Sequence, residues 1–216
     1  MTAGSDRRRR GRPWLAGRFS SRAEIRADLS IHVTGIAFAL VAVTALWSVT
    51  FPVGDAAIVA GVVLYAIGLV AMVTCSAAYN LRRTAGRLTA WLRRLDHAAI
   101  FLMIAGTYSP VFLAMVGGGW GLAVFAAVWV GALAGITLKL LFGPRFETVS
   151  LALYLLLGWI GLIAIRPLAE ALTTPALVLF GLGGLLYTAG VAFYLARGMP
   201  FRIAIWHLFV ILGVAT

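Results

Sequence analysis

The feature that most constrains this chain is a succession of apolar runs of membrane-spanning length. A transmembrane helix needs about 20 mostly apolar residues to cross the hydrocarbon layer. Seven stretches approach or reach that length: residues 31–50, 56–78, 97–116, 120–142, 149–165, 175–196 and 202–216. Hydrophobic residues make up 62% of the 216 residues and charged residues only 12%, about half the charged share of an ordinary soluble domain. A soluble enzyme, a secreted disulfide scaffold and a disordered tail are therefore excluded.

The basic residues indicate how these runs are oriented. If the N-terminus is cytoplasmic, seventeen of the eighteen lysines and arginines fall in or beside cytoplasmic segments, and only Arg166 falls outside. Short cytoplasmic loops carry such an excess of positive charge in membrane proteins. The sequence thus predicts an all-α membrane protein, a seven-transmembrane-helix bundle with its N-terminus in the cytoplasm and its C-terminus outside.

Residues 1–23 are rich in arginine and lack apolar periodicity, so we expect a disordered basic segment ahead of a membrane domain over residues 24–216. The net charge of +11 would suggest nucleic acid in a soluble protein. Because the charges flank membrane spans here, we expect membrane lipids as partners and no nucleic acid. Cys75 is the single cysteine, so no disulfide partner is expected within the chain.

Polar and ionisable side chains are costly within a span, and each is a functional candidate by default. The candidates are Asp28, His32, Ser76, Asn80, Asp96, His97, Glu147 and His207. In the predicted topology all of them lie near the cytoplasmic leaflet, which predicts a polar pocket that opens inward. Ser76 and Asn80 share one helix face because they are four residues apart.

Several of these residues also have an ordinary structural explanation. Asp96 would cap the third helix, and Glu147 would be a first-turn acid of the fifth. Asp28 and His32 would pair with interfacial arginines and headgroups, and His97 would lie at the interface. Ser76, Asp96 and His207 are not explained as a group in this way.

Five segments carry a resemblance to a known family. They are residues 24–36 (EIRADLSIHVTGI), 76–80 (SAAYN), 92–110 (LRRLDHAAIFLMIAGTYSP), 185–194 (LLYTAGVAFY) and 204–213 (AIWHLFVILG). In these segments the chain resembles the haemolysin III proteins of bacteria, within the progestin and adipoQ receptor family. The resemblance implies a seven-helix bundle in the bacterial inner membrane, with a zinc site near the cytoplasmic leaflet.

The resemblance also implies a ligand set. One histidine comes from Ser-x-x-x-His at the end of the second helix, two come from His-x-x-x-His in the seventh, and an aspartate opening the third helix holds a zinc-bound water. In this chain Ser76 and Asp96 match the pattern. Asn80 and Ile203 stand at two of the three ligand positions, and His207 is the one metal ligand that remains.

Two interpretations follow. In the first, Ser76, Asn80, Asp96 and His207 form a ligand-binding pocket without a cofactor, and the protein acts non-catalytically in membrane lipid sensing or homeostasis. In the second, His207 holds a zinc ion weakly, and Ser76 and Asp96 serve a metal-dependent hydrolase of a lipid amide or ester. A pore or transporter is disfavoured because the third to sixth spans carry almost no polar residues along their inner faces.

Overall fold

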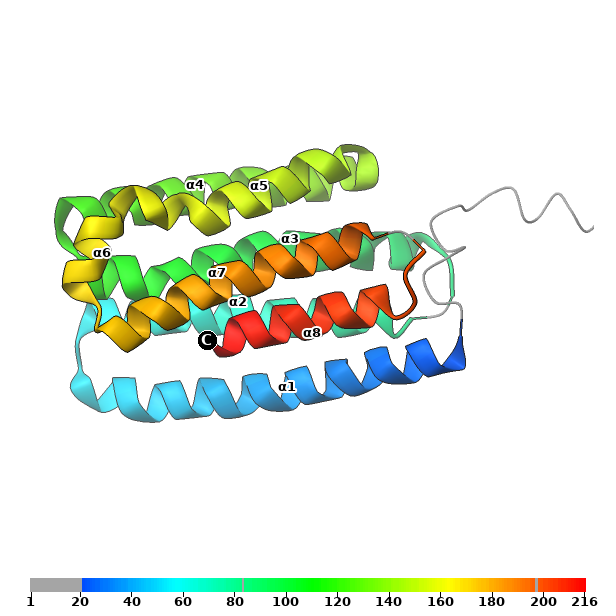
Figure 1. The fold of residues 1–216 in the computed structure, drawn as a ribbon, viewed down its shortest axis with the longest axis horizontal. Helices are drawn as coiled ribbons and strands as arrows, with labels where there is room; N and C mark the ends of the chain where they lie inside the picture. The colour runs from blue at the N-terminus through cyan, green and yellow to red at the C-terminus, as the bar shows by residue number, and fades with distance from the viewer. Residues whose placement is uncertain (1–20, 83, 197) are drawn as a thin grey trace, which may run out of the picture.

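The structure, a computed structural model, describes residues 21–82, 84–196 and 198–216. Every regular element within these ranges is helical, and the long helices lie side by side in one bundle (Figure 1). The α-helices are α1 (Arg22–Thr50), α2 (Ala56–Asn80), α3 (Arg87–Tyr108), α4 (Gly118–Phe142), α5 (Glu147–Trp159), α6 (Ile165–Ala171), α7 (Thr174–Leu195) and α8 (Arg202–Ala215). Shorter helical segments are η1 (Phe51–Val53), η2 (Ser109–Val116), η3 (Gly143–Phe146) and η4 (Ile160–Ala164).

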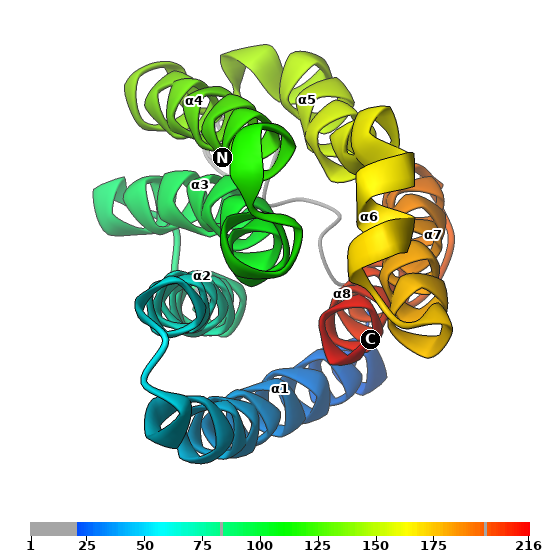
Figure 2. The ribbon, with the colours of Figure 1, turned by 90° about the vertical axis from the view of Figure 1, so that its left-hand side faces the viewer.

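Five helical stretches of the described residues are long and apolar enough to cross a membrane. They are Arg22–Val53, Ala56–Asn80, Arg87–Val116, Gly118–Ala171 and Thr174–Leu195, and Arg202–Ala215 is apolar but shorter. The predicted spans 120–142 and 149–165 both fall within Gly118–Ala171. This stretch turns back at η3, so that α4 and α5 lie next to each other in both views (Figures 1 and 2). The helical membrane architecture is thus confirmed, whereas the number of crossings and their orientation stay predictions.

Most of the lysines and arginines in the described residues lie at or near one end of the bundle, which is on the right in Figure 1. At this end α1, α3, α5 and α8 begin, and α2, α4 and α7 end. Its basic residues include Arg22, Arg87, Arg93, Arg145 and Arg202. We call it the basic end.

Helix α1 begins earlier than the sequence predicted, at Arg22 instead of residue 31. Its first turn is closed by a capping box: the Ser21 hydroxyl accepts from the Glu24 N–H at 3.2 Å, and the Glu24 carboxylate accepts from the Ser21 N–H at 3.1 Å. Residues 21–23 are therefore ordered, contrary to their place in the segment predicted to be disordered. Residues 1–20 of that segment lie outside the described residues.

Helix α3 also begins early, at Arg87 instead of residue 97, so the connection that precedes it is shorter than the predicted spans imply. The buried Thr89 hydroxyl holds its first turn by donating to the Thr84 carbonyl and accepting from Arg82 Nε at 3.2 Å. Asp96 consequently lies well inside the helix. The interpretation of Asp96 as a helix cap is wrong.

Glycines allow α2 to approach α3 and its continuation η2 at backbone distance. A Cβ on Gly61 would lie 2.6 Å from the Pro110 Cα, and one on Gly68 would lie 3.0 Å from the Leu102 carbonyl oxygen. Small residues serve this purpose in membrane bundles, where close van der Waals packing holds helices together. Because Pro110 has no N–H for the helical ladder, the chain continues from Ser109 as the π-helix η2.

We predict that Gly61→Ala destabilises the bundle. The added methyl group meets backbone atoms of Pro110, and overpacking of this kind costs about 1–3 kcal/mol of unfolding free energy. Thermal unfolding of the detergent-purified protein measures the loss. Gly181→Ala in α7 is the matched control, because nothing lies within 4 Å of its added Cβ. Equal losses in both variants would contradict close packing at Gly61.

Candidate functional site

Helices α1, α2 and α8 bring five polar side chains together near the basic end. Asp28 and His32 come from one face of α1, Ser76 and Asn80 from the last turn of α2, and His207 from the second turn of α8. Asp28 is 1% exposed and His32 6% exposed. We call these five residues the polar cluster.

Hydrogen bonds from the two histidines connect the three helices. Nδ1 of His207 lies 2.6 Å from Oδ1 of Asp28, which joins α8 to α1. Nδ1 of His32 lies 2.8 Å from the backbone carbonyl oxygen of Asp28, and its Nε2 lies 3.3 Å from the Ser76 hydroxyl, which joins α1 to α2. The two imidazole rings meet edge to face, with their centroids 4.6 Å apart.

Asn80 completes the contacts among the three helices by linking α2 to α8. Its amide nitrogen donates to the Ser76 carbonyl oxygen at 2.9 Å and to the Ser76 hydroxyl at 3.1 Å. The same nitrogen lies 3.5 Å from Nε2 of His207. With Nδ1 donating to Asp28, the Nε2 of a neutral His207 is an acceptor, so both ring nitrogens face a polar partner.

Asp96 borders the polar cluster from α3. Its carboxylate is close enough to Ser76 and His207 to interact with them electrostatically. On its other side it lies 3.5 Å from Nδ1 of His97. The structure thus brings Ser76, Asn80 and His207 together, with Asp96 at their edge, and their role as a ligand-binding pocket stays a prediction.

Three residues are placed differently from the sequence-based expectations. Asp28 and His32 do not pair with interfacial arginines, since they are buried and bound to α2 and α8. His97 is not at the interface either: its side chain is 16% exposed and its Nε2 lies 3.3 Å from Glu147. The four-residue spacing of Asp28 and His32 was the available signal that they act together.

Asp28, His32 and His207 form a donor set suited to a transition metal. Each offers a ligand atom, and these atoms lie within 4.8 Å of one another. Imidazole nitrogen and carboxylate oxygen are ordinary zinc ligands. Oδ2 of Asp28 is buried and has no hydrogen-bond partner among the described residues.

The Asp28–His207 contact, however, has the length of a hydrogen bond. Two ligand atoms about 2 Å from a tetrahedral zinc ion stand roughly 3.3 Å apart, whereas these atoms are 2.6 Å apart. Oδ1 of Asp28 and Nδ1 of His207 therefore do not both bind a zinc ion in this arrangement, and a metal held by this set would use other atoms of these side chains or require the Asp28–His207 hydrogen bond to open.

Glu24 fixes the relative position of α1 and α8 close to this site. In addition to closing the capping box of α1, its buried carboxylate accepts the backbone N–H of Phe201 at 2.9 Å. Phe201 precedes α8 in the left-handed region, at φ 58°. This contact sets where α8 begins, and thereby the height at which His207 meets Asp28.

A family model described as "Haemolysin-III related" matches residues 26–216 of this chain. The chain belongs to the haemolysin III family. Since the family's bacterial members are membrane proteins and several helices are long enough to cross a bilayer, this haemolysin III-family chain is a multi-pass membrane protein.

Curated relatives agree with this assignment. Hemolysin-3 of Bacillus cereus is 45% identical over 121 residues, which are 56% of this chain and 55% of that protein. The Hemolysin-3 homolog of Bacillus subtilis (strain 168) is 43% identical over 124 residues, 57% of this chain and 58% of the relative. The matched regions thus span less than two thirds of either bacterial relative.

A more distant relative is the human monocyte to macrophage differentiation factor, 27% identical over 164 residues, which are 70% of this chain and 65% of that protein. No solved structure matches the chain.

We predict that Asp28→Ala lowers the stability of the bundle. The substitution leaves His207, whose side chain is only 12% exposed, without its 2.6 Å partner, and a stranded buried polar group costs about 1–3 kcal/mol. Thermal unfolding in detergent measures the change. Asp28→Asn keeps an oxygen acceptor and should recover part of the loss.

Glu170→Ala is the control for that measurement, because Glu170 forms an exposed pair with Arg166, and such pairs contribute little. An Asp28→Ala protein as stable as the Glu170→Ala protein would show that the Asp28–His207 contact does not hold α1 in place.

Proposed function

We propose that this haemolysin III-family protein is non-catalytic and that its polar cluster works without a metal, in the sensing of membrane lipids or in lipid homeostasis. The observation that carries the proposal is the bonding of His207: Nδ1 lies against Asp28 and Nε2 faces the Asn80 amide nitrogen. The lone pair that would bind a metal therefore faces an amide N–H. Asn80 and Ile203, which stand where the resemblance implies histidines, do not fit the family's zinc site, because isoleucine has no ligand atom and an amide oxygen is a weak ligand.

The position of α1 suggests how such a protein would respond to lipid. Helix α1 lies at the outside of the bundle (Figure 2) and exposes Val33, Leu40 and Val41. The polar cluster joins its first half to α2 and α8. A change in lipid packing that draws α1 outward would break these hydrogen bonds, which couples the state of the membrane to the cluster.

We further infer that the basic end lies at the cytoplasmic leaflet. In the sequence, seventeen of the eighteen lysines and arginines fall in or beside cytoplasmic segments if the N-terminus is cytoplasmic, in accordance with the positive-inside rule, and the basic end is where helix α1 begins. The polar cluster would then lie at the depth of the cytoplasmic headgroups.

A second candidate is a metal-dependent hydrolase of a lipid amide or ester. The grouping of Asp28, His32 and His207, with the unsatisfied Oδ2 of Asp28, favours it. A zinc ion held there would supply Lewis-acid activation of water and of a carbonyl group. Asp96 and Ser76 would be the neighbouring groups that hold and transfer a proton, so Asp96→Asn would abolish lipid cleavage while leaving the protein folded.

Elemental analysis of the detergent-purified protein separates the two candidates. We expect substoichiometric zinc in the natural sequence and about one zinc per chain in Asn80→His/Ile203→His, which restores three histidine ligands. Asn80→Gln/Ile203→Leu changes the same positions without adding ligands and should remain without zinc. Stoichiometric zinc in the natural protein that is lost in His32→Gln would overturn the metal-free proposal and favour the hydrolase.

A further inference from the structure

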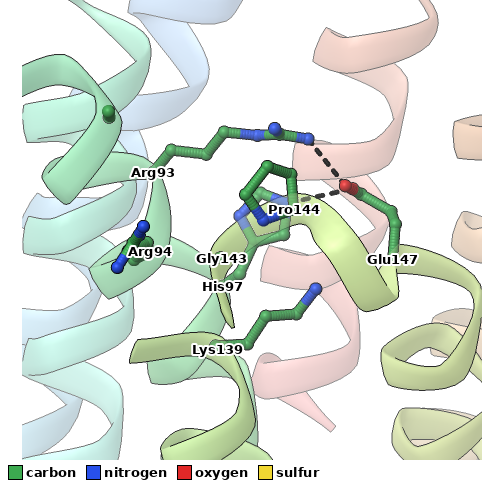
Figure 3. Close-up of a pocket in the computed structure, with 8 residues that line it drawn as sticks. Arg93, Arg94, His97, Lys139, Gly143, Pro144 and Glu147 are labelled. Carbon is green, nitrogen blue, oxygen red and sulfur yellow. Dashed lines mark hydrogen bonds and ion pairs between the residues drawn. The ribbon is translucent and has the colours of Figure 1, made fainter. Parts of the chain in front are cut away.

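A second polar site lies at the basic end, apart from the polar cluster. A cavity of about 110 Å³ opens between α3, α4, η3 and α5 (Figure 3), several times the roughly 10–15 Å³ that one water requires. Its charged and polar lining comes from Arg93, Arg94, His97, Lys139 and Glu147. Neither candidate function, the metal-free lipid sensor or the metal-dependent hydrolase, involves this cavity.

The acid in this cavity is already engaged by its neighbours. Glu147 accepts from Arg93 Nη2 at 2.7 Å and from the Tyr194 hydroxyl at 2.9 Å, and it lies 3.3 Å from Nε2 of His97. Figure 3 draws the first and last of these contacts as dashed lines. Glu147 therefore neutralises at most one positive charge of the site.

Lys139 is a basic residue of the cavity that takes no part in these contacts. It is 2% exposed, and among the described residues no hydrogen bond or close ion pair engages its ammonium group, although the charge of Glu147 acts on it. In Figure 3 its side chain extends from α4 toward the space that Arg93 and Glu147 approach from α3 and α5. Buried charges are normally paired, because desolvating an unpaired ion is expensive.

Arg94 adds a third positive charge at the rim. Its guanidinium donates to the Leu140 carbonyl oxygen at 2.7 Å and lies 5.0 Å from the centre of the Trp91 ring. Gly143, at the start of η3, lies close to Arg94 because it has no side chain: a Cβ there would lie 2.9 Å from Arg94 Nε. Its φ is also positive, a conformation that favours glycine. Three basic side chains thus line the cavity beside one carboxylate.

We propose that this cavity binds the phosphate group of an anionic membrane lipid, with Lys139 and Arg94 as its main contacts. Phosphate oxygens suit both side chains, as a point charge for lysine and as a planar fork for arginine. The surrounding surface suits a lipid: the exposed side chains next to the cavity include Trp91, Leu141 and Phe142. The acyl chains would lie against these apolar groups while the phosphate enters the cavity.

Thermal unfolding of the full chain in a neutral detergent tests this proposal. The probes are short-chain phosphatidylglycerol, phosphatidylcholine of the same chain length, and inorganic phosphate. A ligand that binds only the folded state raises the unfolding temperature by an amount that grows with the logarithm of its concentration relative to its Kd. We expect phosphatidylglycerol to stabilise the natural protein at concentrations at which the other two probes have little effect.

Two variants should weaken that stabilisation about tenfold in apparent affinity, the effect of losing one charged hydrogen bond. Lys139→Gln removes the unpaired cation. Ala90→Glu adds a carboxylate at the cavity wall, where Ala90 is exposed. If Lys139→Gln does not fold, Ala90→Glu alone tests whether the cavity binds the lipid phosphate. Ala90→Gln and Arg166→Gln are the controls, the latter removing a positive charge from exposed helix α6.

Other outcomes would overturn the proposal. Equal stabilisation by phosphatidylcholine would show that the phosphate is not selected through its net charge. Equal stabilisation by inorganic phosphate, lost in the same variants, would make the cavity a site for free phosphate and not for a lipid. Full response to phosphatidylglycerol in Ala90→Glu would place the lipid elsewhere. None of these results depends on the zinc content of the polar cluster, so the two proposals fail separately.

Discussion

Lipid forms no hydrogen bonds, so each polar group between the ends of these helices must find a partner inside the protein. The backbone meets this requirement by forming helices, the ionisable side chains meet it by gathering near one end, and residues such as Tyr108 and Trp129 meet it through hydrogen bonds elsewhere in the bundle. The free-energy cost of placing Asp28 alone in an apolar membrane helix would be prohibitive. It is tolerated because α8 brings His207 to 2.6 Å and α1 brings the backbone-bound His32 beside it.

The sequence was informative wherever the signal is local. Apolar runs predicted the helices, and the long matching segments predicted the family. The start of α3 was missed because the residues from Arg87 to Arg94 carry charges that are typical of a loop. A helix that extends beyond the hydrocarbon layer can be polar on its outer turns, so composition alone does not separate the two cases. Thr89, buried at the helix start, gives no distinguishing pattern in sequence.

The site was predictable in part for the same reason. Spacing indicates which residues share a helix face, and it placed Ser76 beside Asn80. It does not indicate which helices are neighbours, and the contact of Asp28 with His207 joins positions near opposite ends of the chain. The departures at Asn80 and Ile203 could be identified from the motif, but the hydrogen bonds that take the place of ligand bonds depend on tertiary structure.

The adjacent residues Asp96 and His97 connect the two polar sites. Asp96 borders the polar cluster, whereas His97 contacts Glu147 at the cavity. Since both project from α3, a displacement of this helix alters the surroundings of both sites at once.

The contact between Glu24 and Phe201 bears on how the chain is assembled. A membrane protein is synthesised from its N-terminus, so α1 enters the bilayer long before α8 exists. Throughout that interval Asp28 and the Glu24 carboxylate lack the partners that α8 provides. Docking of the last helix onto the first supplies both contacts together, so a pair of acids on α1 without them distinguishes an unfinished bundle from a complete one. A quality-control protease or chaperone that recognises polar groups in the membrane would encounter these two carboxylates without their contacts only on incomplete molecules.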